Sequence, residues 1–230
     1  EGELVVPPPS EEERRHRSDE GETQWLIEQS KLKILAPPAP PANRESDVGH
    51  ISKDHTPGLT SIIVLNYNGL HHIKKCIRSI KECTGAPYEL IVIDNGSTDG
   101  SRAYLRGIPG IRLVENPKNI GAPAGRNQGI AIARGEFFVF LDNDTMVTEG
   151  WLERFLVFAD SNPGYGLLGP MSNCVSGEQL VLQPGYTTYE ELQAFGRDWA
   201  LKFKGQGVIK SRLILFCLFA RREVILKIGG

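Results

Sequence analysis

Two aspartates separated by one residue are the most chemically informative pair in this 230-residue sequence. Asp142 and Asp144 directly follow the apolar residues 137–141. Such a run is typical of a strand buried on both faces of a parallel α/β sheet, where ligands bind beyond the carboxyl ends of the strands. Adjacent carboxylates resist joint ionisation unless a cation compensates them. The pair therefore predicts a Mg²⁺ or Mn²⁺ site that also holds a phosphate-bearing ligand.

Two other interpretations of this acidic turn have to be weighed. Asp144 could simply cap the following helix, which would make the turn structural. A calcium loop would place Asp142, Asp144 and Glu153 at its first, third and twelfth positions. Met146 and Val147 then occupy positions that need an oxygen ligand and a glycine, so calcium is disfavoured.

The segments around this pair alternate between the sequence pattern of a buried strand and that of a helix. Apolar and β-branched runs predict strands, and apolar residues at helical spacing predict the helices between them. The predicted strands cover residues 61–66, 89–94, 111–114 and 136–141, and the helices cover 71–83, 101–106 and 122–134. This order predicts a mostly parallel sheet flanked by helices. Further on, we expect a helix at 149–160, a strand at 165–169 and a helix at 189–203.

Polar residues also follow the first two predicted strands. Asn66 and Tyr67 end the first, and Asp94, Asn95 and Gly96 end the second. Because parallel strands present their carboxyl ends at one edge, all should line the same crevice as the two aspartates. A glycine turn lets backbone amides approach a ligand, and Asp94 could bind a base or a ribose hydroxyl. Alternatively, Asp94 closes a local Asx turn.

Composition and charge limit the class of protein. Hydrophobic residues make up 40% and charged residues 23%, as in a globular chain. Residues 1–60 hold 7 Lys/Arg and 12 Asp/Glu, whereas 61–230 hold 19 and 16, a balance too weak to predict nucleic-acid binding. No apolar run is long enough for a transmembrane segment. Four cysteines without metal or disulfide spacing, and no visible secretory leader, predict a cytoplasmic protein, with a peripheral position at the inner face of the membrane as an alternative.

Residues 1–57 have the composition of a linker. They contain two proline clusters and an excess of acidic residues, which favour extended, largely disordered chain. Residues 22–35 could form one short amphipathic helix. We therefore expect a proline-rich acidic linker at 1–57 and a folded domain at 58–230.

Several segments, in order, resemble the family-two glycosyltransferases. These segments are residues 61–69, 89–101, 119–121, 125–129 and 133–144, with weaker similarity at 169–177 and 216–230. The resemblance implies the Rossmann-like GT-A fold and transfer of a sugar, with inversion, from a UDP-, GDP- or dTDP-sugar. It implies an acceptor that is a glycan, a lipid-linked molecule or a protein, as in polysaccharide biosynthesis, and a hexosyltransferase type of activity.

The resemblance also assigns roles to residues. It implies that Asn66, Tyr67 and Asp94, with the adjacent Asn95 and Gly96, bind the nucleotide. It implies that Asp142 contacts ribose and that Asp142 and Asp144 hold the metal ion. Arg126 and Asn127 would lie near the donor, where Arg126 either neutralises the diphosphate or packs its helix.

The general base for the acceptor hydroxyl cannot be assigned to any residue. In the family it lies just after a segment that resembles residues 221–230, so we expect it beyond residue 230, in a longer protein with further domains, and expect weak or no activity from these 230 residues. One alternative is a non-catalytic module that binds nucleotide sugars. A less favoured alternative is a nucleotidyltransferase, which needs a glycine-rich, arginine-containing loop that residues 66–69 do not supply.

Overall fold

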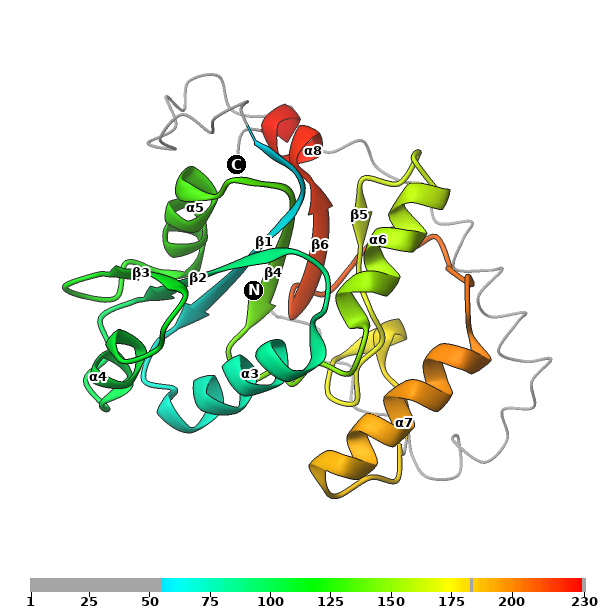
Figure 1. Ribbon diagram of the computed structural model, residues 1–230, viewed down its shortest axis with the longest axis horizontal. Helices are drawn as coiled ribbons and strands as arrows, with labels where there is room; N and C mark the ends of the chain where they lie inside the picture. The colour runs from blue at the N-terminus through cyan, green and yellow to red at the C-terminus, as the bar shows by residue number, and fades with distance from the viewer. Residues whose placement is uncertain (1–54, 183, 229–230) are drawn as a thin grey trace, which may run out of the picture. The chain divides into compact units, whose positions relative to one another are not determined.

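Four apolar segments form the parallel part of a six-stranded sheet (Figure 1). The computed structural model describes residues 55–182 and 184–228. The parallel strands are β1 (Thr56–Asn66), β2 (Tyr88–Asp94), β3 (Ile111–Glu115) and β4 (Gly135–Asp142). Two later strands, β5 (Leu167–Leu168) and β6 (Cys217–Arg221), complete the order β3-β2-β1-β4-β6-β5, with β6 antiparallel to both neighbours. The predicted mostly parallel α/β sheet is thus confirmed.

The central strands are apolar because helices cover both of their faces. On one face, Ile62 and Val64 of β1 pack with the helices α3 (Leu70–Cys83), α4 (Ser101–Arg106) and α6 (Trp151–Ser161). On the other, Ile63 and its neighbours pack with α5 (Ala122–Ile132) and α8 (Arg222–Ile228). Figure 1 shows α3 and α4 on the opposite side of the sheet from α5 and α8. Burial on both faces explains why the strands lack an alternating polar pattern.

The segment between β5 and β6 contains a 3₁₀ turn, η1 (Gly177–Gln179), and the helix α7 (Tyr189–Lys202). α7 begins with a capping box in which Thr188 accepts a hydrogen bond from the Glu191 backbone amide and the Glu191 carboxylate accepts one from the Thr188 amide. The rings of Phe195 and Trp199 on α7 stack with centroids 5.4 Å apart, and the ring of Phe203, just after the helix, lies tilted against Trp199 at 4.6 Å. These three aromatic residues therefore pack in one row.

The sequence-based boundaries differ modestly from those observed. β1 begins five residues earlier than predicted, at Thr56, and so two residues before the predicted start of the domain. α5 ends at Ile132 rather than residue 134, and β5 has two residues instead of five. The predicted linker at 1–57 and its helix at 22–35 fall almost entirely outside the described residues.

Three of the four cysteines are buried, and all four are free thiols. Cys76 and Cys83, seven residues apart on α3, both face the core, and Cys217 lies in β6. Burial raises the pKa of Cys76 to about 12, helped by the charges of Asp144 and Asp142. The buried cysteines pack as small apolar groups in the core. Between residues 55 and 228, no helix that the structure describes has both the length and the apolarity to cross a bilayer.

Candidate functional site

The polar residues that end β1, β2 and β4 meet at one edge of the sheet. In the β1–β2 pairing Asn66 lies opposite Asp94, and in the β1–β4 pairing Leu65 lies opposite Asp142. The three strands are adjacent and parallel, so their carboxyl ends leave the sheet side by side. The predicted convergence of the strand ends is therefore present.

Asn66 joins the three strand ends through a single amide. Its Nδ2 donates to Asp94 Oδ1 at 3.4 Å and to Ser97 Oγ at 3.2 Å, while its Oδ1 accepts from Asn143 Nδ2 at 2.8 Å. Asn66 and Asp94 are fully buried. Because both ends of the amide are engaged, its orientation is fixed, and the middle residue of the acidic turn is tied to β1.

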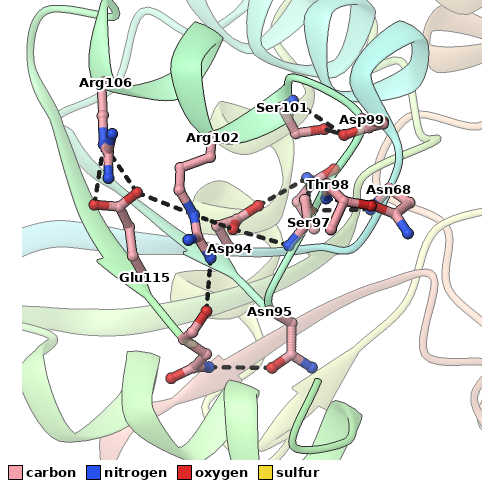
Figure 2. Close-up of polar contacts among 12 residues, drawn as sticks. Asn68, Asp94, Asn95, Ser97, Thr98, Asp99, Ser101, Arg102, Arg106 and Glu115 are labelled. Atoms are coloured by element: carbon pink, nitrogen blue, oxygen red, sulfur yellow. Dashed lines mark hydrogen bonds and ion pairs between the residues drawn. The ribbon is translucent and has the colours of Figure 1, made fainter. Parts of the chain in front are cut away.

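Asp94 is held by donors from its own loop and from α4. Its Oδ2 accepts from the Ser97 amide at 3.1 Å and from Arg102 Nε at 3.2 Å. Arg102 also donates to the Asn116 carbonyl at 2.7 Å and lies 3.3 Å from Glu115 (Figure 2). The predicted local bond of Asp94 to its own loop is thus observed, to the amide three residues on rather than the two of an Asx turn. Contact of Asp94 with a nucleotide stays a prediction.

Asn95 and Gly96 brace the loop that follows β3. Asn95 Oδ1 accepts from Asn116 Nδ2 at 3.1 Å and from the Ile120 amide at 3.2 Å, and its Nδ2 donates to Asn119 Oδ1 at 2.8 Å. Gly96 has φ +86°, and a Cβ there would lie 2.6 Å from the backbone of residue 118. Only glycine fits this approach. The structure thus gives both residues a packing role, and their nucleotide contact stays a prediction.

Arg126 is a cationic neighbour of the acidic turn. Arg126 donates a hydrogen bond to Asp142 Oδ1 at 2.8 Å. The Arg126 side chain is 22% exposed and the Asp142 side chain is 39% exposed. Burial raises the pKa of Asp142, Arg126 lowers it, and the nearby Asp144 raises it, with a net upward shift. Asp144 itself is exposed. The turn therefore presents the half-buried carboxylate of Asp142 and the exposed carboxylate of Asp144, with the Arg126 guanidinium beside Asp142.

Two glycines bring Arg126 to this position. Gly125 and Gly129 of α5 face β1 so closely that a Cβ would lie 2.5 Å from Leu65 Cδ1 or Ile63 Cγ2 respectively. α5 therefore rests almost directly on the strand, and Arg126 follows the first of the two glycines. Asn127, half-buried in the next position, makes no side-chain hydrogen bond to the part of the chain that the structure describes.

The turn fits a magnesium or manganese ion that shares its coordination with a ligand. The described residues contain no cluster of three His, Cys, Asp or Glu side chains that could hold a metal ion alone. Mg²⁺ in nucleotide sites commonly uses only one or two carboxylates together with phosphate oxygens and water. The upward pull of Asp144 on the pKa of Asp142 is the repulsion that a divalent cation would relieve.

A hollow of about 520 Å³ lies beside the strand ends, at the start of α3. Its lining belongs to the β1–α3 loop, to the first turns of α3 and to the loop before α4. None of the predicted nucleotide-binding residues lines it, although Tyr67, half-exposed, is in the same loop. The lining residues are Asn68, Gly69, Leu70, His71, His72, Lys74 and Asp99.

Sequence reasoning missed two residues of this site. Asn143 lies inside the predicted acidic motif, but its contact with Asn66 spans 77 positions and has no local signal. A Cβ on Gly69 would lie 2.2 Å from Asn143 Nδ2, so the glycine is a clue that becomes visible only in three dimensions. Arg102 follows Asp94 by eight residues and could have been considered as its partner.

Residues 61–206 match the model of glycosyl transferase family 2. The chain belongs to this family. It is 33% identical over 176 residues to the glycosyltransferase AglE of Haloferax volcanii, covering 74% of this chain and 54% of AglE. It is 29% identical over 143 residues to TuaG of Bacillus subtilis, a putative teichuronic acid biosynthesis glycosyltransferase, covering 58% and 56% respectively.

Solved structures of two glycosyltransferases share the fold. The mannosyltransferase PcManGT of Pyrobaculum calidifontis, in complex with GDP-Man and Mn²⁺, superposes with a TM-score of 0.54 at 21% identity, covering 74% of this chain and 46% of its own. S. aureus TarS 1–349 in complex with UDP-GlcNAc gives 0.53 at 20% identity, covering 74% and 47%. The chain therefore has the GT-A fold of this family and of these neighbours. The chain spans about half the length of the proteins that it matches.

Proposed function

We propose that this glycosyl transferase family 2 chain binds a nucleoside diphosphate sugar at the carboxyl edge of its sheet and serves sugar transfer with inversion. The observation that carries the proposal is the acidic turn, in which Asp142 and Asp144 follow a central strand and Arg126 lies 2.8 Å from Asp142. Carboxylates for a divalent cation and a guanidinium for phosphate oxygens are the groups that a diphosphate requires. The UDP-GlcNAc and GDP-Man complexes of similar folds support this choice of ligand.

The proposed reaction assigns separate tasks to these residues. Asp142 and Asp144 would hold Mg²⁺ or Mn²⁺, which supplies stabilisation of the charge on the departing nucleoside diphosphate. Arg126 orients Asp142 and adds positive charge near the same phosphates, and Asn143 keeps the turn against β1 through Asn66. The acceptor hydroxyl attacks the anomeric carbon, the bond from this carbon to the diphosphate breaks, and a base takes the hydroxyl proton.

Calorimetric titration tests the donor site. UDP, GDP and dTDP are each titrated with and without Mn²⁺ into wild type, Asp142→Asn/Asp144→Asn and the control Asp160→Asn/Asp198→Asn. The control makes the same chemical change at two exposed carboxylates on α6 and α7. We expect Mn²⁺-dependent binding of one nucleotide, retained in the control and at least about tenfold weaker in the first variant, as for loss of a charged contact worth about 1.5–3 kcal/mol.

Two results would argue against this function. Folded wild type that binds none of the nucleotides, or equal binding by Asp142→Asn/Asp144→Asn, would contradict the assignment of the site. Nucleotide-sugar binding without release of nucleoside diphosphate would favour a non-catalytic binding module instead.

A further inference from the structure

A long stretch of the chain near the site carries only positive charge. Between Asp198 and Glu223 there is no acidic residue, whereas six Lys or Arg residues occur there. The rest of the sequence is acidic enough to give the whole chain a net charge of −2. Within this stretch we define residues 201–212, the last two residues of α7 and the ten that follow them, as the basic loop.

Three cations of the basic loop have no acidic partner in the part of the chain that the structure describes, although Lys202 Nζ lies 5.3 Å from the centre of the Phe203 ring. Lys210 pairs with Glu178 at 2.9 Å. Lys202, Lys204 and Arg212 are exposed and form no ion pair with residues 55–182 or 184–228. The loop thus presents at least three positive charges without internal compensation.

The same loop exposes large apolar side chains. Leu201, Val208 and Ile209 are 73%, 78% and 76% exposed. The backbone before Val208 is nevertheless packed, because a Cβ on Gly207 would lie 2.6 Å from the ring of Phe158 in α6. Apolar side chains held in solvent by a packed backbone are a common mark of an interaction surface.

The basic loop leads to the candidate site. Beyond it the chain runs to Phe216, whose carbonyl accepts a hydrogen bond from the Asp142 amide at 2.8 Å. Only residues 213–216 separate the basic loop from this hydrogen bond, so a surface bound by the loop would lie close along the chain to the acidic turn.

We propose that residues 201–212 dock on the surface of an anionic lipid bilayer. Interfacial segments combine apolar side chains that enter the headgroup boundary with Lys and Arg that meet anionic lipids, and long lysine stems can lie along the apolar layer. The charge of the loop complements such a surface. A second copy of the chain fits less well, because a two-fold interface formed by the loop would bring two sets of these cations together.

Co-sedimentation of the full 230-residue chain with phosphatidylcholine vesicles, with and without phosphatidylglycerol, tests this surface. We compare wild type with Lys202→Gln/Lys204→Gln and with Val208→Ser/Ile209→Ser. Each lysine near an anionic surface contributes roughly a fivefold change in binding, so the first variant should bind roughly 25-fold more weakly. Loss of two inserted aliphatic side chains should weaken binding by about tenfold or more.

The control Lys75→Gln/Lys227→Gln makes the same change of net charge at exposed positions of α3 and α8. It should bind anionic vesicles about as well as wild type, and wild-type binding should weaken with added salt. Equal urea midpoints for all variants would show that they are folded, since every altered side chain is exposed.

Three outcomes would overturn the proposal. These are no binding of wild type to anionic vesicles, equal weakening by the control and the loop variants, and a concentration-dependent dimer in gel filtration that Val208→Ser/Ile209→Ser abolishes. The last would assign the loop to a contact between copies. The vesicle assay involves no nucleotide, so its result is independent of the proposed donor site.

Discussion

Replacing Asn66 by aspartate should create a buried carboxylate pair and make stability strongly pH-dependent. The change removes the amide hydrogens that Asn66 donates to Asp94 and Ser97 and keeps the side-chain shape. The introduced carboxyl would face Asp94 Oδ1 at the present 3.4 Å, in a place that is fully buried. Two like charges at that separation repel by about 5 kcal/mol at an effective dielectric constant of 20.

Protonation of the introduced carboxyl sets an upper limit on this penalty. Keeping a carboxyl with an unfolded pKa of about 3.9 neutral costs about 5–6 kcal/mol at pH 8 but only about 1.5 kcal/mol at pH 5. The folded-state pKa is raised, so the penalty is absent below the unfolded pKa and grows as pH rises until the folded pKa is passed. We expect Asn66→Asp to lose about 3–5 kcal/mol at pH 8 and about 1–2 kcal/mol at pH 5.

Urea unfolding followed by tryptophan fluorescence measures this difference, since Trp151 and Trp199 lie in the folded part. The control Asn173→Asp makes the same chemical change at an exposed position and should cost little at either pH. If Asn66→Asp behaved like this control at pH 8, the inference that the Asn66 amide joins the strand ends would be wrong.

Three further substitutions test other parts of the argument. Gly129→Ala should lower the free energy of unfolding by about 1–2 kcal/mol, because overpacking against β1 outweighs the gain in helix propensity. Gly125→Ala should lower it less, since the flexible end of a leucine side chain faces this glycine. Urea unfolding of the two variants measures the difference. Arg126→Met should raise the pKa of Asp142 further, so the pH below which Mn²⁺ binding is lost moves upward in calorimetry, and an unmoved midpoint would exclude this role of the ion pair. Glu89→Gln should lower the free energy of unfolding by about 1–3 kcal/mol at pH 7, because it leaves buried donors unpaired. Burial raises the pKa of Glu89, but its hydrogen bonds lower the pKa overall. The difference in stability between variant and wild type should therefore shrink in unfolding experiments at acid pH, where wild type loses this charge.

The sequence predicted the strands well where burial on both faces dictates their composition. Residues 56–60 of β1 were missed because Pro57 and Gly58 read as a turn, and the pairing with β4 is irregular there. α5 ends before its predicted end because long-range contacts replace its last helical bonds. The Arg134 amide donates to Glu89, and Arg222 donates to the Ala133 carbonyl. No periodicity in one sequence reports such contacts.

For the site, the edge and the local hydrogen bond of Asp94 were predictable, and the long-range hydrogen bonds were not. Polar residues after apolar strands placed Asn66, Asp94 and Asp142 together, because parallel strands share one carboxyl edge. Asp94 accepts hydrogen bonds from Arg102 in α4 and from the buried amide of Asn66. Only the folded structure shows these two contacts. The hollow at the start of α3 is likewise a property of loop conformation, which residue types did not reveal.

The close contact of α5 with the sheet also has a consequence for the order in which parts of the molecule open. α5 has 11 residues and two interior glycines, so it would be unstable as an isolated helix in water. Its structure depends on β1 beneath it, whereas α3 has 14 residues and no glycine. Local opening should therefore reach α5 before the strands, and each such event would remove Arg126 from the acidic turn. Arg126 would return to the turn each time α5 docks again, and a ligand that contacts Arg126 would stabilise the helix that carries it.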